Sequence, residues 1–277
     1  MQRIVWSTLF VLALIGARRR SAELLRALGH RRTLAMLSLS AVLVAGNWLV
    51  YIWAISTGRL VEASLGYFIN PLVNVVLGIV FLGERLRPLQ LLACGLAAAG
   101  VAVLTVAAGT VPWMALSLGI SFGFYGLIRK TVRVDPLVGF TVESLLLVPF
   151  AAGYAAFLVG SGASAFARGD LALDVLLANG ASVFLKGDWR LDLLLMLTAV
   201  TTSAPLIWFA SAAQRLRLST VGLLQYLAPS CLLALGVLAY GEPFTTVQAV
   251  SFAAIWTALA LYSADAFVFA RAGRPAV

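Results

Sequence analysis

Charged and metal-binding side chains are scarce in this chain of 277 residues. Asp, Glu, Lys and Arg together make up 11% of the sequence, and there is one histidine, in a basic stretch. A single histidine excludes metal sites of the HExxH kind. The sequence also has no phosphate-binding loop, no GxSxG motif and no dinucleotide-binding glycine pattern. We therefore expect no enzyme activity, no cofactor and no metal site.

Cysteine is rare as well. Cys94 and Cys231 each lie inside an apolar stretch, so they are predicted to be small core residues and not part of a disulfide or metal framework. No cleavable signal is expected, because Arg18, Arg19 and Arg20 stand where a cleavage site would need small residues.

Apolar residues, in contrast, make up 62% of the chain, and the mean hydropathy is +0.99. A soluble domain of this length cannot bury so many apolar side chains, so the predicted solvent is a lipid bilayer. A helix needs roughly 20 apolar residues to cross the bilayer core. The sequence thus predicts an all-α integral membrane protein with nine spans, near 4–17, 33–57, 62–82, 86–108, 112–128, 136–160, 190–212, 218–240 and 245–269.

The formal net charge of +9 comes from arginines that are scattered between the apolar spans, a pattern that does not favour nucleic acid as a partner. When the loops are taken alternately, fifteen of the twenty basic residues fall on one side. The positive-inside rule makes that side, and with it the C-terminus, cytoplasmic. The basic segment 18–32 also has a leucine stripe, which predicts a short helix on the headgroups, and 161–189 is predicted to be an outer loop.

Two stretches of the chain, 61–90 and 219–248, share landmarks at a spacing of 158 residues. The first copy ends on the predicted cytoplasmic side and the second on the opposite side, so the repeat is predicted to be inverted, which requires an odd number of spans per unit. The second half, 109–270, supplies five spans and the first, 1–108, only four, so we expect one further helix before residue 1. The paired landmarks are Pro71 and Pro229, Gly83 and Gly241, Glu84 and Glu242, and Gln90 and Gln248.

Several strings resemble one known family: GNWLVYIWA (46–54), EASLGYFINPLVNVVLG (62–78), FLGERLRPLQ (81–90), SFGFYGLIRK (121–130) and RLRLSTVGLLQYLAPS (215–230). The chain is similar, from about residue 3 to about residue 270, to the EamA family of the drug/metabolite transporter superfamily. The resemblance implies ten helices in two inverted five-helix halves, with both termini cytoplasmic, in a bacterial inner membrane.

Candidate substrate-binding residues form a polar stripe in the first copy of the repeat. Asn70 and Asn74 are four residues apart and Tyr67 precedes them by one turn, so all three lie on one side of the helix, beside the helix-breaking Pro71. They are predicted either to line a central substrate cavity or to bind neighbouring helices and hold the bundle together. The second copy offers Gln225 and Tyr226 before Pro229, and the preceding span offers Asn47, Trp48 and Tyr51. The tryptophans are predicted to anchor or pack the helix, and stacking of Trp48 on a flat substrate is the alternative.

Glu143 is an acidic residue inside the predicted 136–160 span, so it needs a polar partner or a functional role. A carboxylate at this depth is costly unless it faces water, pairs with a cation or is protonated. Two hypotheses follow: a proton carrier that couples transport, or a structural ion pair with Arg129, Lys130 or Arg133.

Two Gly-Glu pairs are predicted to end their helices, because glycine permits the left-handed turn that stops a helix. They are Gly83 with Glu84 and Gly241 with Glu242. Glu84 could also belong to a cytoplasmic gate.

Together these features predict a secondary transporter that moves a small organic metabolite or drug-like compound by alternating access. A membrane enzyme acting on lipid is the alternative, and it would need clustered acidic or histidine side chains at one interface. Lipid and a small-molecule substrate are the expected partners, and homodimer formation is left open.

Overall fold

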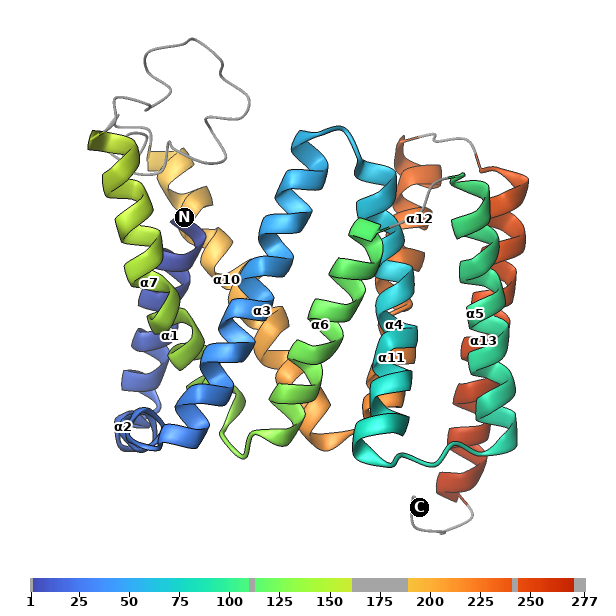
Figure 1. Ribbon diagram of the computed structural model, residues 1–277, viewed down its shortest axis with the longest axis horizontal. Helices are drawn as coiled ribbons and strands as arrows, with labels where there is room; N and C mark the ends of the chain where they lie inside the picture. Colours follow the sequence, from blue (N-terminus) through green and yellow to red (C-terminus); the bar gives the residue numbers. More distant parts are fainter. Residues whose placement is uncertain (1, 110–112, 161–188, 241–243, 272–277) are drawn as a thin grey trace. The chain divides into compact units, whose positions relative to one another are not determined.

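The computed structural model describes residues 2–109, 113–160, 189–240 and 244–271 (Figure 1). Within these ranges every regular element is a helix, which confirms the all-α prediction. The helices are α1 (Gln2–Ala17), α2 (Ser21–Gly29), α3 (Arg31–Ser56), α4 (Leu60–Leu82), α5 (Pro88–Ala107), α6 (Trp113–Thr131), α7 (Pro136–Gly160), α10 (Trp189–Arg215), α11 (Leu218–Leu224), α12 (Leu227–Tyr240) and α13 (Thr246–Arg271).

Six helical segments in the described ranges are long and apolar enough to cross a membrane, and Ile4–Ala17 is a shorter apolar helix. Large apolar side chains such as Val106, Phe150 and Leu238 are among the most exposed in the structure. Outward-facing apolar side chains on long helices are what a lipid solvent requires. The loop predicted at 161–189 lies, up to residue 188, outside the described residues.

Two helices begin with the same hydrogen bond. At the start of α5 the backbone N–H of Arg87 donates to Gln90 Oε1 at 3.2 Å, with Pro88 as the first helical residue. At the start of α13 the backbone N–H of Thr245 donates to Gln248 Oε1 at 2.9 Å. A glutamine three residues into a helix satisfies the N–H that precedes the first turn, so Gln90 and Gln248 fix equivalent helix starts.

The predicted span 218–240 is not one continuous helix. α11 ends at Leu224 and α12 begins at Leu227, with Gln225 and Tyr226 between them. Pro229 has no N–H to donate to the carbonyl oxygen of Gln225, which instead accepts from the N–H of Ala228 at 3.2 Å. By contrast, α4 runs without interruption through Pro71.

Helices in the two halves of the sequence begin in a fixed register. α10, α11 and α13 begin at residues 189, 218 and 246, which is 158 residues after the starts of α3, α4 and α5 at residues 31, 60 and 88. This is the same spacing that separates the paired landmarks in the sequence.

The chain forms two compact units, each built from both halves of the sequence. Unit 1 comprises residues 1–45 and 128–214, and unit 2 comprises residues 46–127 and 215–277. In unit 1, α1 and α2 pack against α7. The buried core of unit 1 includes Val11, Ile15, Leu24, Leu37, Val138 and Val142.

In unit 2, helices that are equivalent by the 158-residue spacing pack against each other in opposite directions, α4 against α11 and α5 against α13 (Figure 1). Small residues allow the close approach. A Cβ added at Gly100 of α5 would lie 2.8 Å from the carbonyl oxygen of Ser251 in α13. Such contacts between small residues are the usual way in which helices associate in lipid.

Candidate functional site

Three carboxamide side chains meet where α4 faces the break between α11 and α12 in unit 2. Gln225 Oε1 accepts hydrogen bonds from Asn70 Nδ2 at 3.0 Å and from Asn74 Nδ2 at 2.8 Å. Asn70 and Asn74 can reach the same acceptor because residues four apart project from one face of a helix. The structure therefore brings together three of the residues that the sequence singled out, one of them from the second copy of the repeat.

Local backbone geometry places Gln225 at this point. The Tyr226 hydroxyl donates to the carbonyl oxygen of Phe68 at 3.1 Å, which ties the break to α4. Gly222 of α11 lies directly on α4, since a Cβ added there would be 2.7 Å from the carbonyl oxygen of Pro71 and 2.8 Å from Asn74 Cβ. Glycine is thus required for this contact.

The amide cluster, defined as Asn70, Asn74 and Gln225, retains capacity to accept hydrogen bonds. The Oδ1 atoms of Asn70 and Asn74 are buried and have no hydrogen-bond partner among the residues that the structure describes. Asn74 is 0% exposed. Because a buried acceptor without a donor costs about 1–3 kcal/mol, a solute or water that donates to these oxygens is stabilised here.

A row of aromatic side chains begins at Tyr67, one helical turn before the amide cluster. Tyr67 packs edge-on against Tyr51, with ring centroids 6.0 Å apart, and Tyr51 packs edge-on against Trp48 at 6.3 Å. Asn47 is used differently, because its Nδ2 donates to the carbonyl oxygen of Leu118 at 2.8 Å and to Ser121 Oγ at 2.9 Å in α6. The amide nitrogen of Asn47 therefore joins two helices.

Glu84 connects the end of α4 to the start of α11. Gly83 adopts the left-handed conformation (φ 63°, ψ 26°), and the N–H of Glu84 donates to the Gly78 carbonyl at 3.0 Å, which closes the helix end. The Glu84 carboxylate accepts from the N–H of Leu218 at 2.6 Å, and from the N–H and hydroxyl of Ser219 at 3.0 and 2.6 Å. Its counterparts by the repeat, Gly241 and Glu242, lie outside the described residues.

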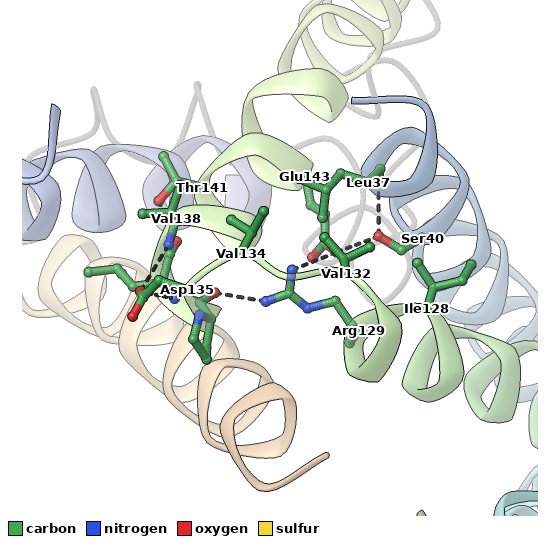
Figure 2. A network of polar contacts seen from close by, with 12 residues as sticks. Leu37, Ser40, Ile128, Arg129, Val132, Val134, Asp135, Val138, Thr141 and Glu143 are labelled. Atoms are coloured by element: carbon green, nitrogen blue, oxygen red, sulfur yellow. Dashed lines mark hydrogen bonds and ion pairs between the residues drawn. The ribbon is translucent and has the colours of Figure 1, made fainter. Parts of the chain in front are cut away.

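A second buried polar centre lies in unit 1 (Figure 2). Arg129 of α6 and Glu143 of α7 are 0% and 1% exposed, and Arg129 Nη1 lies 3.5 Å from Glu143 Oε1. The Ser40 hydroxyl of α3 donates to the same carboxylate oxygen. Of the cations named as partners for Glu143 from the sequence, the structure places Arg129 against it.

Arg129 also holds the turn between α6 and α7. Its Nη2 donates to the carbonyl oxygen of Pro136 at 2.8 Å, and the guanidinium lies against Gly139, where any Cβ would collide with it. Gln214 of α10 donates through Nε2 to the carbonyl oxygens of Arg129, Val132 and Val134, at 3.2, 3.4 and 2.8 Å. These bonds satisfy carbonyls at and just beyond the end of α6.

Asp135 begins α7 on the surface of unit 1. Its Oδ1 accepts from the N–H groups of Leu137 and Val138 at 3.0 and 3.4 Å, and its Oδ2 forms an ion pair with Arg20. Burial acts to raise the pKa of Asp135, but the hydrogen bonds from Arg20, Leu137 and Val138 and the charge of Arg20 outweigh it, so the pKa is lowered.

Residues 1–106 match the model of the EamA-like transporter family. The chain is 43% identical to an uncharacterized transporter of Vibrio cholerae over 99% of this chain and 85% of that protein. It is also 43% identical to protein RarD of Salmonella typhi over 95% of this chain and 84% of that protein. The chain belongs to the EamA family of transporters.

The EamA family consists of membrane proteins, so this chain is a multi-pass membrane protein related to bacterial transporters. A solved structure described only as the crystal structure of a protein shares the fold, with a TM-score of 0.59 and 19% identity over 95% of this chain and 89% of that one.

Sequence reasoning missed three residues that shape the two centres of this EamA protein. Ser40 and Gln214 gave no signal, because serine is common within spans and Gln214 stands beside Arg215, in the basic stretch at the end of α10. Gly222 could have been found, since a small residue within a span indicates close helix contact.

Proposed function

We propose that this chain is a secondary transporter of the bacterial inner membrane that moves a small organic metabolite or drug-like compound by alternating access. Its membership of a transporter family supports the class of function. The observation that carries the mechanism is the amide cluster at an interrupted helix. Transporters commonly place substrate sites where a broken helix exposes polar groups near the middle of the membrane.

We also propose a bundle of nine spans arranged as an inverted repeat, with halves at 1–108 and 109–270. Three pairs of helices start 158 residues apart, and the two glutamine-capped helix starts fall in that register. Within unit 2 the paired helices run in opposite directions, as an inverted repeat requires (Figure 1). The distribution of arginines supports a cytoplasmic C-terminus.

Substrate contact is assigned to the amide cluster, with Tyr67, Tyr51 and Trp48 as an aromatic wall. The neutral amides suit a solute that carries hydrogen-bond donors. Pro71 and the break before Pro229 are assigned as points of bending, since both prolines remove a helical hydrogen bond. Asn47 and Tyr226 support the site by holding helices together, because their polar groups bind the backbone of α6 and α4.

The experiment is a solute-redistribution assay with purified protein in liposomes. A small-molecule extract of bacterial cells is placed outside, and the solutes inside are identified by mass spectrometry. We expect at least one solute to accumulate with the wild-type protein, and to fall to the level of empty liposomes with Asn74→Leu. Absence of any protein-dependent solute, with protein that is folded and inserted, would contradict the transport proposal.

Glu143 can be tested separately as a carrier of protons. Its ion pair with Arg129 and its bond from Ser40 support a structural role. The variant Glu143→Gln keeps a hydrogen-bonding group of similar size but cannot titrate. If it transports with the same pH dependence as the wild type, coupling through Glu143 is rejected. A flattened pH profile in a variant that is still folded and inserted would support coupling.

A further inference from the structure

The basic segment, residues 18–32, contains six arginines and one acidic residue, Glu23. It runs from the end of the apolar helix α1, through α2, to the start of the membrane-spanning helix α3. In Figure 1, α2 is viewed nearly along its axis while α1 and α3 lie lengthwise, so α2 lies across their ends. A helix placed across the ends of membrane helices lies at the level of the lipid headgroups.

Most of the positive charge in the basic segment is not neutralised by protein. Arg20 forms ion pairs with both Glu23 and Asp135. The other arginines have no ion pair with any residue that the structure describes, and all of them are exposed: Arg18, Arg19, Arg26, Arg31 and Arg32.

α2 presents one apolar face to the protein and a mixed face outward. Leu24 and Ala27 are buried against the core of unit 1. On the outer face Leu25 is 69% exposed and stands next to Arg26. A leucine beside arginines suits an interface at which acyl chains and charged headgroups meet.

The turn between α1 and α2 adds a further observation. Arg19 has a backbone φ of 54°. Every other described residue with a positive φ is a glycine. The N–H groups of Arg19 and Arg20 donate to the carbonyl oxygens of Gly16 and Ile15, each at 3.0 Å, which is a helix-ending turn. Glycine would adopt this conformation without strain, so arginine contributes its charge at a conformational cost.

We propose that the basic segment is a binding site for anionic phospholipids. The exposed arginines bind headgroup phosphates, and Leu25 contacts the acyl chains. Clusters of four to eight basic residues next to a membrane helix, or on an amphipathic helix, are typical of such recognition. The site is independent of the substrate site, because none of its residues belongs to the amide cluster or to unit 2.

The experiment measures lipid binding by the full-length protein in a neutral detergent. Phosphatidylglycerol and phosphatidylcholine are titrated separately, and bound lipid is counted by native mass spectrometry. We expect preferential binding of phosphatidylglycerol, weakened about fivefold for each arginine removed in Arg18→Gln, Arg26→Gln and the double variant. Arg85→Gln removes one exposed arginine from unit 2 and is the matched control, with unchanged binding expected.

Arg19→Gly separates lipid binding from folding. We expect its melting temperature in neutral detergent to equal or exceed that of the wild type, because glycine relieves the backbone strain, while phosphatidylglycerol binding falls about fivefold. The proposal is overturned if the double variant binds phosphatidylglycerol as the wild type does, or if Arg85→Gln weakens binding equally. It is also overturned if inorganic phosphate competes at the concentrations at which the lipid binds.

Discussion

The polar groups buried in the two units differ in charge. In unit 1, Arg129 and Glu143 are oppositely charged and almost fully buried, and each is held by further bonds to the protein. In unit 2, the amide cluster is neutral. Among the described residues, the Oδ1 atoms of Asn70 and Asn74 have no hydrogen-bond donor, just as Nε and Nη1 of Arg129 have no acceptor in unit 1. A buried charge cannot release its partner without a large cost, whereas a neutral amide can exchange partners cheaply. The charged centre is therefore suited to fixing structure and the neutral one to binding.

The largest effect is expected on breaking the charged centre. Arg129→Met leaves the Glu143 carboxylate buried without its cation, which should destabilise the protein by about 3–5 kcal/mol. Thermal unfolding in detergent, followed by tryptophan fluorescence, measures the change. The double variant Arg129→Met with Glu143→Leu removes both charges and should recover most of the loss. A single variant as stable as the wild type would show that the pair is not what fixes unit 1.

A smaller effect is expected from crowding the neutral centre. Gly222→Ala introduces a Cβ that would lie 2.7 Å from the carbonyl oxygen of Pro71, so α11 must move away from α4. Overpacking of this kind costs about 1–3 kcal/mol. Gly95→Ala in α5 is the control, since a Cβ there meets no atom within 4 Å. Equal melting temperatures for the two variants would contradict the close contact at Gly222.

Asn74→Leu should separate binding from stability. It removes a hydrogen bond to Gln225, and such bonds between membrane helices contribute on average about 0.6 kcal/mol, so the melting temperature should change little. Flux of whichever solute the wild type transports should fall at least about tenfold, as expected for a loss of about 1.4 kcal/mol at the site. A variant with normal flux would assign the amide cluster to helix packing alone.

The sequence predicted the helical membrane fold because long apolar runs are a direct consequence of a lipid solvent. It also predicted which polar residues of α4 share a face, since helical periodicity fixes that relation. It could not predict that Gln225 would accept from both asparagines. That contact depends on the break between α11 and α12, and Pro71, the equivalent proline in α4, produces no break.

The sequence also could not predict which basic residue would pair with Glu143 in unit 1. Three basic residues close together in the chain could have met Glu143, and the structure places Arg129 Nη1 3.5 Å from its Oε1. The glycine at position 139 makes room for the guanidinium, and Ser40 supplies a hydroxyl from α3, which is distant in sequence. Such choices depend on tertiary contacts that no local pattern encodes.

The smallest effect is expected at Asp135, whose charge is exposed compared with that of Glu143. Because its pKa in the folded protein is lower than the ordinary value of 3.8, the ionised carboxylate stabilises the fold above that pH, and the contribution disappears as the pH falls through the folded value. Asp135→Asn keeps a residue that can cap α7 but removes the charge that pairs with Arg20. The melting temperature of the wild type should therefore be slightly higher than that of the variant at about pH 5 to 7, where Asp135 is ionised. The melting temperatures of the two proteins should converge in acid. A difference in melting temperature that stays constant down to about pH 3 would show that the charge of Asp135 contributes nothing to stability.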